Sequence, residues 1–260
     1  QKEFDEVCDK LLENGVQPIY IAAADAWPIL FQFALDPVMQ EHPEYIDKLN
    51  AGEMKYADIP EFTAMCEWFK MAAEKGYFGK NFASDTWDYA NEVLGTGEAA
   101  MMFCWDTWLD TDYDSEAYEY AGSDFGIMPV FMGTCDEGTY EGGNVNLFLV
   151  NKNGERVEAA KDFVNFCANP DNYNRAFEGI PTAAVFKGQT TNVNSTQYEE
   201  NKESVDKLLR ASCAQPKIVG YNGTEGAKAL LQLMLGDVTV EECISLIDED
   251  RIATLKSFAQ

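Results

Sequence analysis

Trp105, Asp106 and Trp108 lie close together in the sequence, directly after a short apolar run. An aromatic ring can stack on the C–H face of a sugar, and a neighbouring carboxylate can accept hydrogen bonds from the sugar's hydroxyl groups. These three residues therefore predict a loop that binds carbohydrate. The alternative is that one or both tryptophans belong to the hydrophobic core, because large aromatic side chains are well buried on average.

The groups that common catalytic sites need are scarce in this chain. The single histidine, His42, lies beside Pro43 with no candidate nucleophile near it, which argues against Ser-His-Asp and Cys-His sites. No G-x-S-x-G, Walker or G-x-G-x-x-G motif occurs. We therefore predict no catalytic residue and a protein that is not an enzyme. A carbohydrate-active enzyme stays open as an alternative, because Asp106 could pair with another of the 45 acidic residues.

We also predict no metal site and no cofactor. Asp110, Asp112 and Asp114 have the spacing that opens a calcium-binding EF-hand loop, but Ser115 replaces its glycine and Ala121 its bidentate glutamate. The seven cysteines form no C-x-x-C pair and have no histidine neighbour, so neither a zinc site nor a redox motif is indicated.

The composition argues against two classes of partner. The chain of 260 residues has a formal net charge of −26, and such a surface repels nucleic acid and anionic lipid. Hydrophobic residues make up 46% of the chain, enough for the core of one large domain or two modest ones. No run approaches the roughly 20 apolar residues that span a bilayer. The first residues enter an amphipathic helix directly, so we expect the sequence to begin inside a longer protein.

Strands and helices alternate along the chain, with helix in excess, and the predicted class is α/β. The clearest helix begins at Pro60 and ends at Gly76, with one apolar face. Residues 99–104 form a continuous small and apolar run, which predicts a strand buried on both faces. Further strands are predicted over residues 16–24, 125–130 and 145–150, and further helices over residues 29–35, 44–55, 86–94, 156–167, 201–211, 226–235 and 240–247.

The order of several short motifs resembles the extracellular solute-binding proteins of ABC sugar importers, the maltodextrin-binding-like family. Each motif is weak by itself, but together they extend over nearly the whole chain. The motifs are GVQPI at 15–19 with DAWP at 25–28, KGYF at 75–78 with GEAAM at 97–101, GG at 142–143 with NKN at 151–153 and the helix after it, and LGDVTVEE at 235–242.

This resemblance implies a periplasmic-binding-protein-like fold of type II, in which two α/β lobes enclose the ligand in a cleft. Residues 1–141 are then the first part of the second, C-terminal lobe. Residues 142–188 are a hinge strand and a helical segment that return into the first lobe, and residues 189–260 return to the second lobe. Most of the N-terminal lobe has no counterpart in this sequence.

The resemblance also extends the predicted binding site beyond the first three residues. The loop with Asp25 and Trp27 and the turn at Gly143 face the cleft in the family. For Trp27 a role in the core remains an alternative. The predicted ligand-contacting residues are Asp25, Trp27, Trp105, Asp106, Trp108, Gly143, Asn144, Tyr221 and Asn222.

The implied function is to bind a mono- or oligosaccharide outside the cell and to deliver it to the membrane permease of an ABC importer. The family further implies attachment to the cell surface as a lipoprotein, through an N-terminal segment that this sequence lacks. One alternative keeps the fold but changes the solute to another polar molecule such as a polyamine, because acidic and aromatic groups together can hold a cation.

Overall fold

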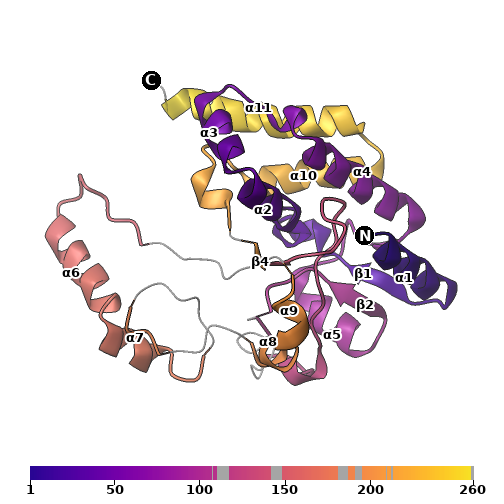
Figure 1. The fold of residues 1–260 in the computed structure, drawn as a ribbon, viewed down its shortest axis with the longest axis horizontal. Coiled ribbons are helices and arrows are strands. Elements are labelled where there is room, and N and C mark those ends of the chain that lie inside the picture. The colour runs from indigo at the N-terminus through magenta and orange to yellow at the C-terminus, as the bar shows by residue number, and fades with distance from the viewer. Residues whose placement is uncertain are drawn as a thin grey trace.

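The computed structural model describes residues 1–106, 108–109, 117–141, 148–180, 187–190, 195–208, 210–211 and 213–258. Within these residues the chain forms a mixed α/β structure in which helices predominate, as Figure 1 shows. The α-helices are α1 (Lys2–Glu13), α2 (Gln32–Glu41), α3 (Pro43–Ala51), α4 (Pro60–Lys75), α5 (Ala90–Gly95), α6 (Val157–Cys167), α7 (Pro170–Ala176), α8 (Thr196–Glu200), α9 (Lys202–Val205), α10 (Gly223–Leu235) and α11 (Val240–Phe258). The strands are β1 (Gln17–Tyr20), β2 (Ala99–Met102), β3 (Tyr140–Glu141) and β4 (Arg210–Ala211), and the short 3-10 helices are η1 (Ala23–Asp25), η2 (Trp27–Ile29), η3 (Tyr56–Asp58), η4 (Trp87–Tyr89), η6 (Gly122–Asp124) and η7 (Gln215–Lys217).

Strands β1 and β2 run parallel, with Tyr20 opposite Met102. Parallel strands need a long connection between them, and the helices α2 to α5 provide it. A second parallel pair, β3 and β4, joins the middle of the chain to its last third. The register of β1 and β2 puts the carboxyl ends of both strands at one edge of the sheet, so the loops that follow them lie together.

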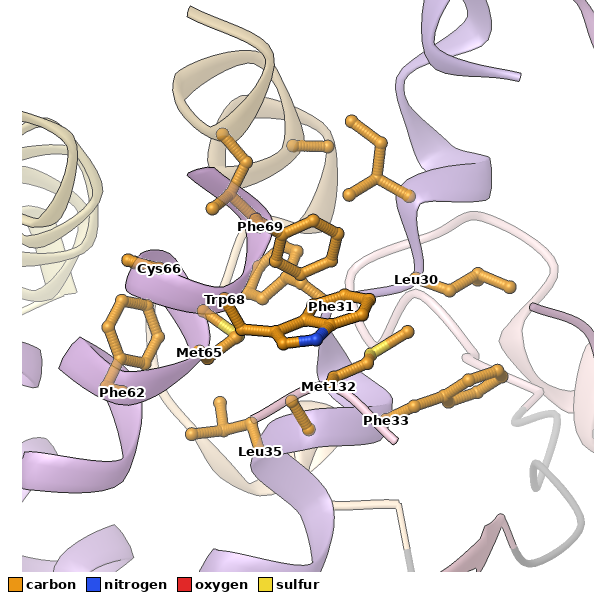
Figure 2. Packing of buried hydrophobic residues seen from close by; sticks show 14 of the residues in the cluster. Leu30, Phe31, Phe33, Leu35, Phe62, Met65, Cys66, Trp68, Phe69 and Met132 are labelled. Atoms are coloured by element: carbon orange, nitrogen blue, oxygen red, sulfur yellow. The ribbon is translucent and has the colours of Figure 1, made fainter. Parts of the chain in front are cut away.

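The main hydrophobic core lies among α2, α4, α10 and α11, which pack against one another. Figure 2 shows its aromatic centre, where Trp68 lies among Phe31, Met65, Phe69 and Met132. The predicted helix after Pro60 is confirmed as α4, and Gly76 ends it with a φ of 86° that glycine adopts without strain. The spacing of apolar residues over 60–75 therefore predicted both the helix and the face that it buries.

A buried charged pair fixes the last helix to this core. Arg251 is 1% exposed, and its guanidinium donates hydrogen bonds to the carbonyl oxygens of Leu49 and Met54 at 2.9 and 3.1 Å. The Asp248 carboxylate accepts hydrogen bonds from the backbone N–H groups of Tyr56 and Ala57. Because these hydrogen bonds replace water around both charges, α11 is held firmly against α3 and η3.

Several predicted elements differ from the structure. Strand β2 is not buried on both faces, because Ala100 is exposed and Met101 and Met102 are partly exposed beside a cavity. Residues 125–130 form no strand with β2; Val130 alone makes an antiparallel bridge, to Thr139.

Two more predictions in the second half of the chain were wrong or lie partly outside the described residues. The predicted strand 145–150 is not formed at residues 148–150, and residues 145–147 lie outside the described part of the chain. The predicted helix 201–211 is instead the short α9 followed by β4, because the chain turns to pair with β3.

Helices α6 and α7 form an arm that lies apart from the rest of the molecule, as Figure 1 shows. The two helices pack on each other, and neither has a buried side chain. Phe163 and Phe166 on α6 are 59% and 57% exposed, and Leu149 before it is 90% exposed. This arm therefore presents an apolar face to its surroundings. Among the described residues, no helix combines the length and apolarity that crossing a membrane requires.

Candidate functional site

Four tryptophans from three separate places in the sequence form one cluster at the edge of the β1–β2 sheet. The ring of Trp27 lies 5.0 Å from that of Trp87 and 5.6 Å from that of Trp108. Trp108 in turn lies 5.1 Å from Trp87 and 5.0 Å from Trp105. These tilted and edge-on arrangements are the ones that aromatic quadrupoles favour. We call these four residues the tryptophan cluster.

The backbone between η1 and η2 is shaped to present Trp27. Ala26 before it and Leu30 after it both have positive φ, at 60° and 49°, a region that residues with a side chain rarely adopt. Such strain persists only where the surrounding structure enforces it, and it is concentrated at functional sites. Trp27 is 39% exposed, so the strained turn leaves part of this residue open to solvent.

Asp25 connects two parts of the tryptophan cluster. Its Oδ2 atom accepts a hydrogen bond of 2.7 Å from the backbone N–H of Trp87. The hydroxyl of Tyr20, the last residue of β1, donates a hydrogen bond of 2.7 Å to the carbonyl of Thr86. The end of β1 and the loop after it are therefore bound to two adjacent residues at the start of η4.

Asp106 lies beside the tryptophan cluster and forms a hydrogen bond with the segment that begins α8. Its Oδ2 accepts a hydrogen bond of 2.8 Å from the hydroxyl of Ser195, which is fully buried and also accepts from the backbone N–H of Tyr198. Burial, together with the nearby Asp106 and Tyr198, raises the pKa of Tyr140. Asp106, Tyr140, Ser195 and Tyr198 therefore form a polar group, which we call the Asp106 group.

Trp105 has one side in the core and one side towards a cavity. Its ring meets Phe33 edge-on at 5.0 Å. Among the described residues, no hydrogen-bond partner reaches its buried Nε1–H. A cavity of about 500 Å³ begins beside Trp105 and Asp106 and continues between β2 and residues 124–131. The cavity and the tryptophan cluster thus share Trp105.

The structure brings together five of the nine predicted site residues: Asp25, Trp27, Trp105, Asp106 and Trp108. It places Tyr221 and Asn222 at the start of α10, where they serve the fold: Tyr221 stacks on Phe31 at 5.7 Å, and Asn222 caps the helix by accepting from the N–H of Glu225. Helix α10 packs against η2, the short helix that begins at Trp27.

Some predicted site residues lie outside the described part of the chain, and some residues of the observed site were not predicted. Gly143 and Asn144 lie outside the described part of the chain, as do the candidate calcium ligands Asp110, Asp112 and Asp114. In the described part, no three His, Cys, Asp or Glu side chains come together as metal ligands would. Sequence reasoning missed Trp87, because it lies within the predicted helix 86–94 and nothing in its neighbourhood links it to Trp27. It predicted Asp106 but missed Tyr140, Ser195 and Tyr198, which are far from Asp106 in sequence.

Comparisons with known proteins assign the chain to a family. Residues 2–203 match the sequence model described as bacterial extracellular solute-binding protein, and the chain therefore belongs to this family. Over 160 residues it is 28% identical to the uncharacterized ABC transporter extracellular-binding protein PH1214 of Pyrococcus horikoshii; the alignment covers 62% of this chain and 34% of that protein. The family resemblance inferred from the motif order is thus confirmed.

The fold is similar to solved binding proteins of low sequence identity. The putative binding protein MsmE of Bacillus subtilis, in an open conformation, superposes with a TM-score of 0.72 at 14% identity, covering 100% of this chain and 66% of that one. A chitin oligosaccharide binding protein gives 0.68 at 16% identity, with 99% and 65% covered. The sugar transporter BL01359 of Bacillus licheniformis, in complex with stachyose, gives 0.64 at 15% identity, with 96% and 65% covered.

These superpositions confirm the periplasmic-binding-protein-like α/β fold. The chain spans about a third of the length of the curated relative and about two thirds of the length of the solved proteins. The structure accordingly corresponds to a part of this fold.

Proposed function

We propose that this protein binds a mono- or oligosaccharide outside the cell and delivers it to the permease of an ABC importer. The observation that carries the proposal is the tryptophan cluster, which lies with Asp25 and Asp106 at the carboxyl edge of two parallel strands. In open α/β sheets this edge is where ligands bind.

The chemistry of the cluster suits a sugar. The exposed face of Trp27 offers a stacking surface for the C–H groups of a pyranose ring, and the nearby carboxylates accept hydrogen bonds from its hydroxyls. A sugar with the wrong hydroxyl pattern would leave polar groups unpaired once binding has removed their water, which costs about 1–3 kcal/mol for each group. Family membership and the sugar ligands named for similar folds, stachyose and chitin oligosaccharides, support this class of ligand.

We also propose how the chain is divided between lobes. Residues 1–141 and 189–260 would form the second lobe, and residues 142–188 would carry the arm of α6 and α7 into a first lobe. The separation of the arm and the exposure of Phe163 and Phe166 support this division, because an exposed apolar face of this kind is normally covered. A lipid anchor would belong to the segment that precedes the first lobe.

Isothermal titration calorimetry on the full-length protein tests the proposed function. The panel is stachyose, chitin oligosaccharides, xylo-oligosaccharides and maltotriose, with spermidine as the cationic alternative. We expect at least one sugar to bind, and we expect Trp27→Ala to weaken that binding. Binding of spermidine without binding of any sugar would overturn the proposal in favour of a polyamine. Shortened products after incubation with an oligosaccharide would overturn it in favour of an enzyme.

A further inference from the structure

The cavity beside the tryptophan cluster is large and mostly apolar. Its volume of about 500 Å³ lies within the range of small-molecule sites, about 300–1,000 Å³. One wall is β2, with Met101 and Met102, and the other is the segment with Ile127, Met128 and Val130. Side chains of this kind offer alkyl groups and thioethers, which are at best weak hydrogen-bond acceptors.

Three polar side chains of this cavity belong to the Asp106 group, where the cavity meets the tryptophan cluster, and a further one, Asp124, belongs to the segment 124–131. Asp106, Tyr140 and Tyr198 line the cavity, and Ser195 connects Asp106 to Tyr198, because its hydroxyl donates to Asp106 and accepts from the backbone N–H of Tyr198. Trp105 also lines the cavity, and its ring is 5.0 Å from that of Trp108 in the cluster. A ligand bound at the tryptophan cluster would therefore lie next to the polar Asp106 group, and the mostly apolar cavity would lie on the other side of that group.

A second sugar ring would fit the apolar space poorly. Its hydroxyl groups would lose water and face methionine and isoleucine side chains, and unpaired buried hydroxyls lower affinity. An alkyl or aryl group would instead gain affinity from every apolar contact. Because Met101, Met102 and Met128 are flexible and polarisable, the walls can adapt to more than one shape of apolar group.

We propose that the preferred ligand is a glycoside with an apolar aglycone, whose sugar lies on the tryptophan cluster and whose aglycone occupies this cavity. The inference rests on the proposed function, since the sugar must bind at the cluster. It adds a substrate class, sugar conjugates with an alkyl or aryl group, and it assigns Met101, Met102 and Ile127 to selection of the aglycone.

The test uses methyl, butyl and hexyl glycosides of glucose, galactose, xylose and N-acetylglucosamine, below their micelle concentrations, with the full-length protein. For the sugar that binds, we expect affinity to rise by up to about fourfold for each added methylene, the gain that full burial gives. Hexanol by itself serves as a ligand without a sugar.

Two substitutions block the cavity and one serves as a matched control. Gly126 lines the cavity, and a Cβ added there would have no atom within 4 Å, so Gly126→Leu has room to begin a side chain at the cavity wall. Ala100→Leu does the same from the exposed face of β2, in case the first variant does not fold. Ala51→Leu adds the same side chain at an exposed position on α3, away from the cavity. In the two cavity variants we expect affinity no longer to rise with the length of the alkyl group. In Ala51→Leu we expect affinity to rise as it does in the parent.

The outcomes separate the two proposals. Binding of a sugar with no dependence on alkyl length overturns the inference and leaves the proposed function intact. The same gain in the blocked variants as in the parent also overturns the inference, because the alkyl group then binds elsewhere. Hexanol binding as tightly as the hexyl glycoside overturns the commitment to a glycoside. If no sugar and no glycoside binds, both the proposed function and the inference fail.

Discussion

The carboxylate of Asp25 accepts a 2.7 Å hydrogen bond from the backbone N–H of Trp87, across 62 residues of sequence. Trp87 contacts both Trp27 and Trp108, so this single bond holds one member of the tryptophan cluster against two others. The acidic residue predicted to contact the ligand therefore also has a structural role, which is to position an aromatic ring.

Replacing Asp25 separates these two roles. In Asp25→Ala the acceptor is lost and Trp87 is no longer fixed, so we expect sugar affinity to fall by about tenfold, the effect of one such hydrogen bond. Stability should change little, because Asp25 is exposed. Asp25→Asn keeps a side-chain acceptor and should retain most of the affinity. If Asn is as damaging as Ala in calorimetry, the charge itself contacts the ligand.

Trp27 and Trp105 should respond differently to truncation. Trp27 is 39% exposed, so Trp27→Ala should weaken sugar binding and leave the melting temperature nearly unchanged. Trp105 packs on the core residue Phe33, so Trp105→Ala should cost about 2–4 kcal/mol of unfolding free energy. Urea unfolding and calorimetry on both variants check this, with Trp105→Phe as the control that keeps an aromatic ring. Equal stability losses at the two positions would contradict the assignment.

Sequence reasoning went furthest where one local pattern decides the outcome. The apolar face of residues 60–75 and the glycine after them specify α4 completely. The Trp105–Trp108 loop was recognised because aromatic and acidic residues adjoin in sequence. Trp87 and Ser195 could not be found in this way, because each meets its partner, Trp27 or Asp106, only through contacts between segments that are distant in sequence. Residues 125–130 have the composition of a strand, but composition cannot show whether a partner strand lies beside them.

Ser195 should be important for stability although it is far from the tryptophans in sequence. Ser195→Ala removes the hydrogen bond to Asp106 and the N-terminal cap of α8 together, so we expect a loss of about 1–3 kcal/mol. Asp106→Asn should cost less, because it keeps an oxygen that can accept from Ser195. Chemical denaturation of both single variants and of the double variant gives the coupling between the two positions. A coupling of zero would show that the hydrogen bond contributes nothing.

The contact of Asp9 with Lys75 and Tyr77 predicts a pH dependence of stability. Lys75 Nζ lies 2.9 Å from both carboxylate oxygens, and the hydroxyl of Tyr77 donates to one of them at 2.7 Å. The hydrogen bond from Lys75, followed by that from Tyr77, lowers the pKa of Asp9. A lowered pKa contributes stability above the ordinary aspartate pKa of about 3.9, and this stability is lost as pH falls through the lower folded value.

Asp9→Asn should therefore be less stable than the parent at about pH 7, and the difference should vanish in acid once Asp9 is protonated in both states of the parent. Thermal unfolding of the two proteins at several pH values measures this difference. Asp237→Asn, at an exposed aspartate away from this contact, should show no such pattern. A difference that stays constant into acid would mean that the ion pair is not its source.

The arm of α6 and α7 gives a test of how the lobes are divided. Phe163 and Phe166 are more than half exposed in this chain, and the proposed first lobe would cover them. In the full-length protein, the double variant Phe163→Ser/Phe166→Ser should lower the unfolding free energy by about 2–5 kcal/mol, because two buried rings are lost. Tyr89→Ser, at an aromatic residue 61% exposed outside the arm, should have little effect. If the double variant is as stable as the parent, the arm does not pack on a first lobe, and its apolar face must have another partner.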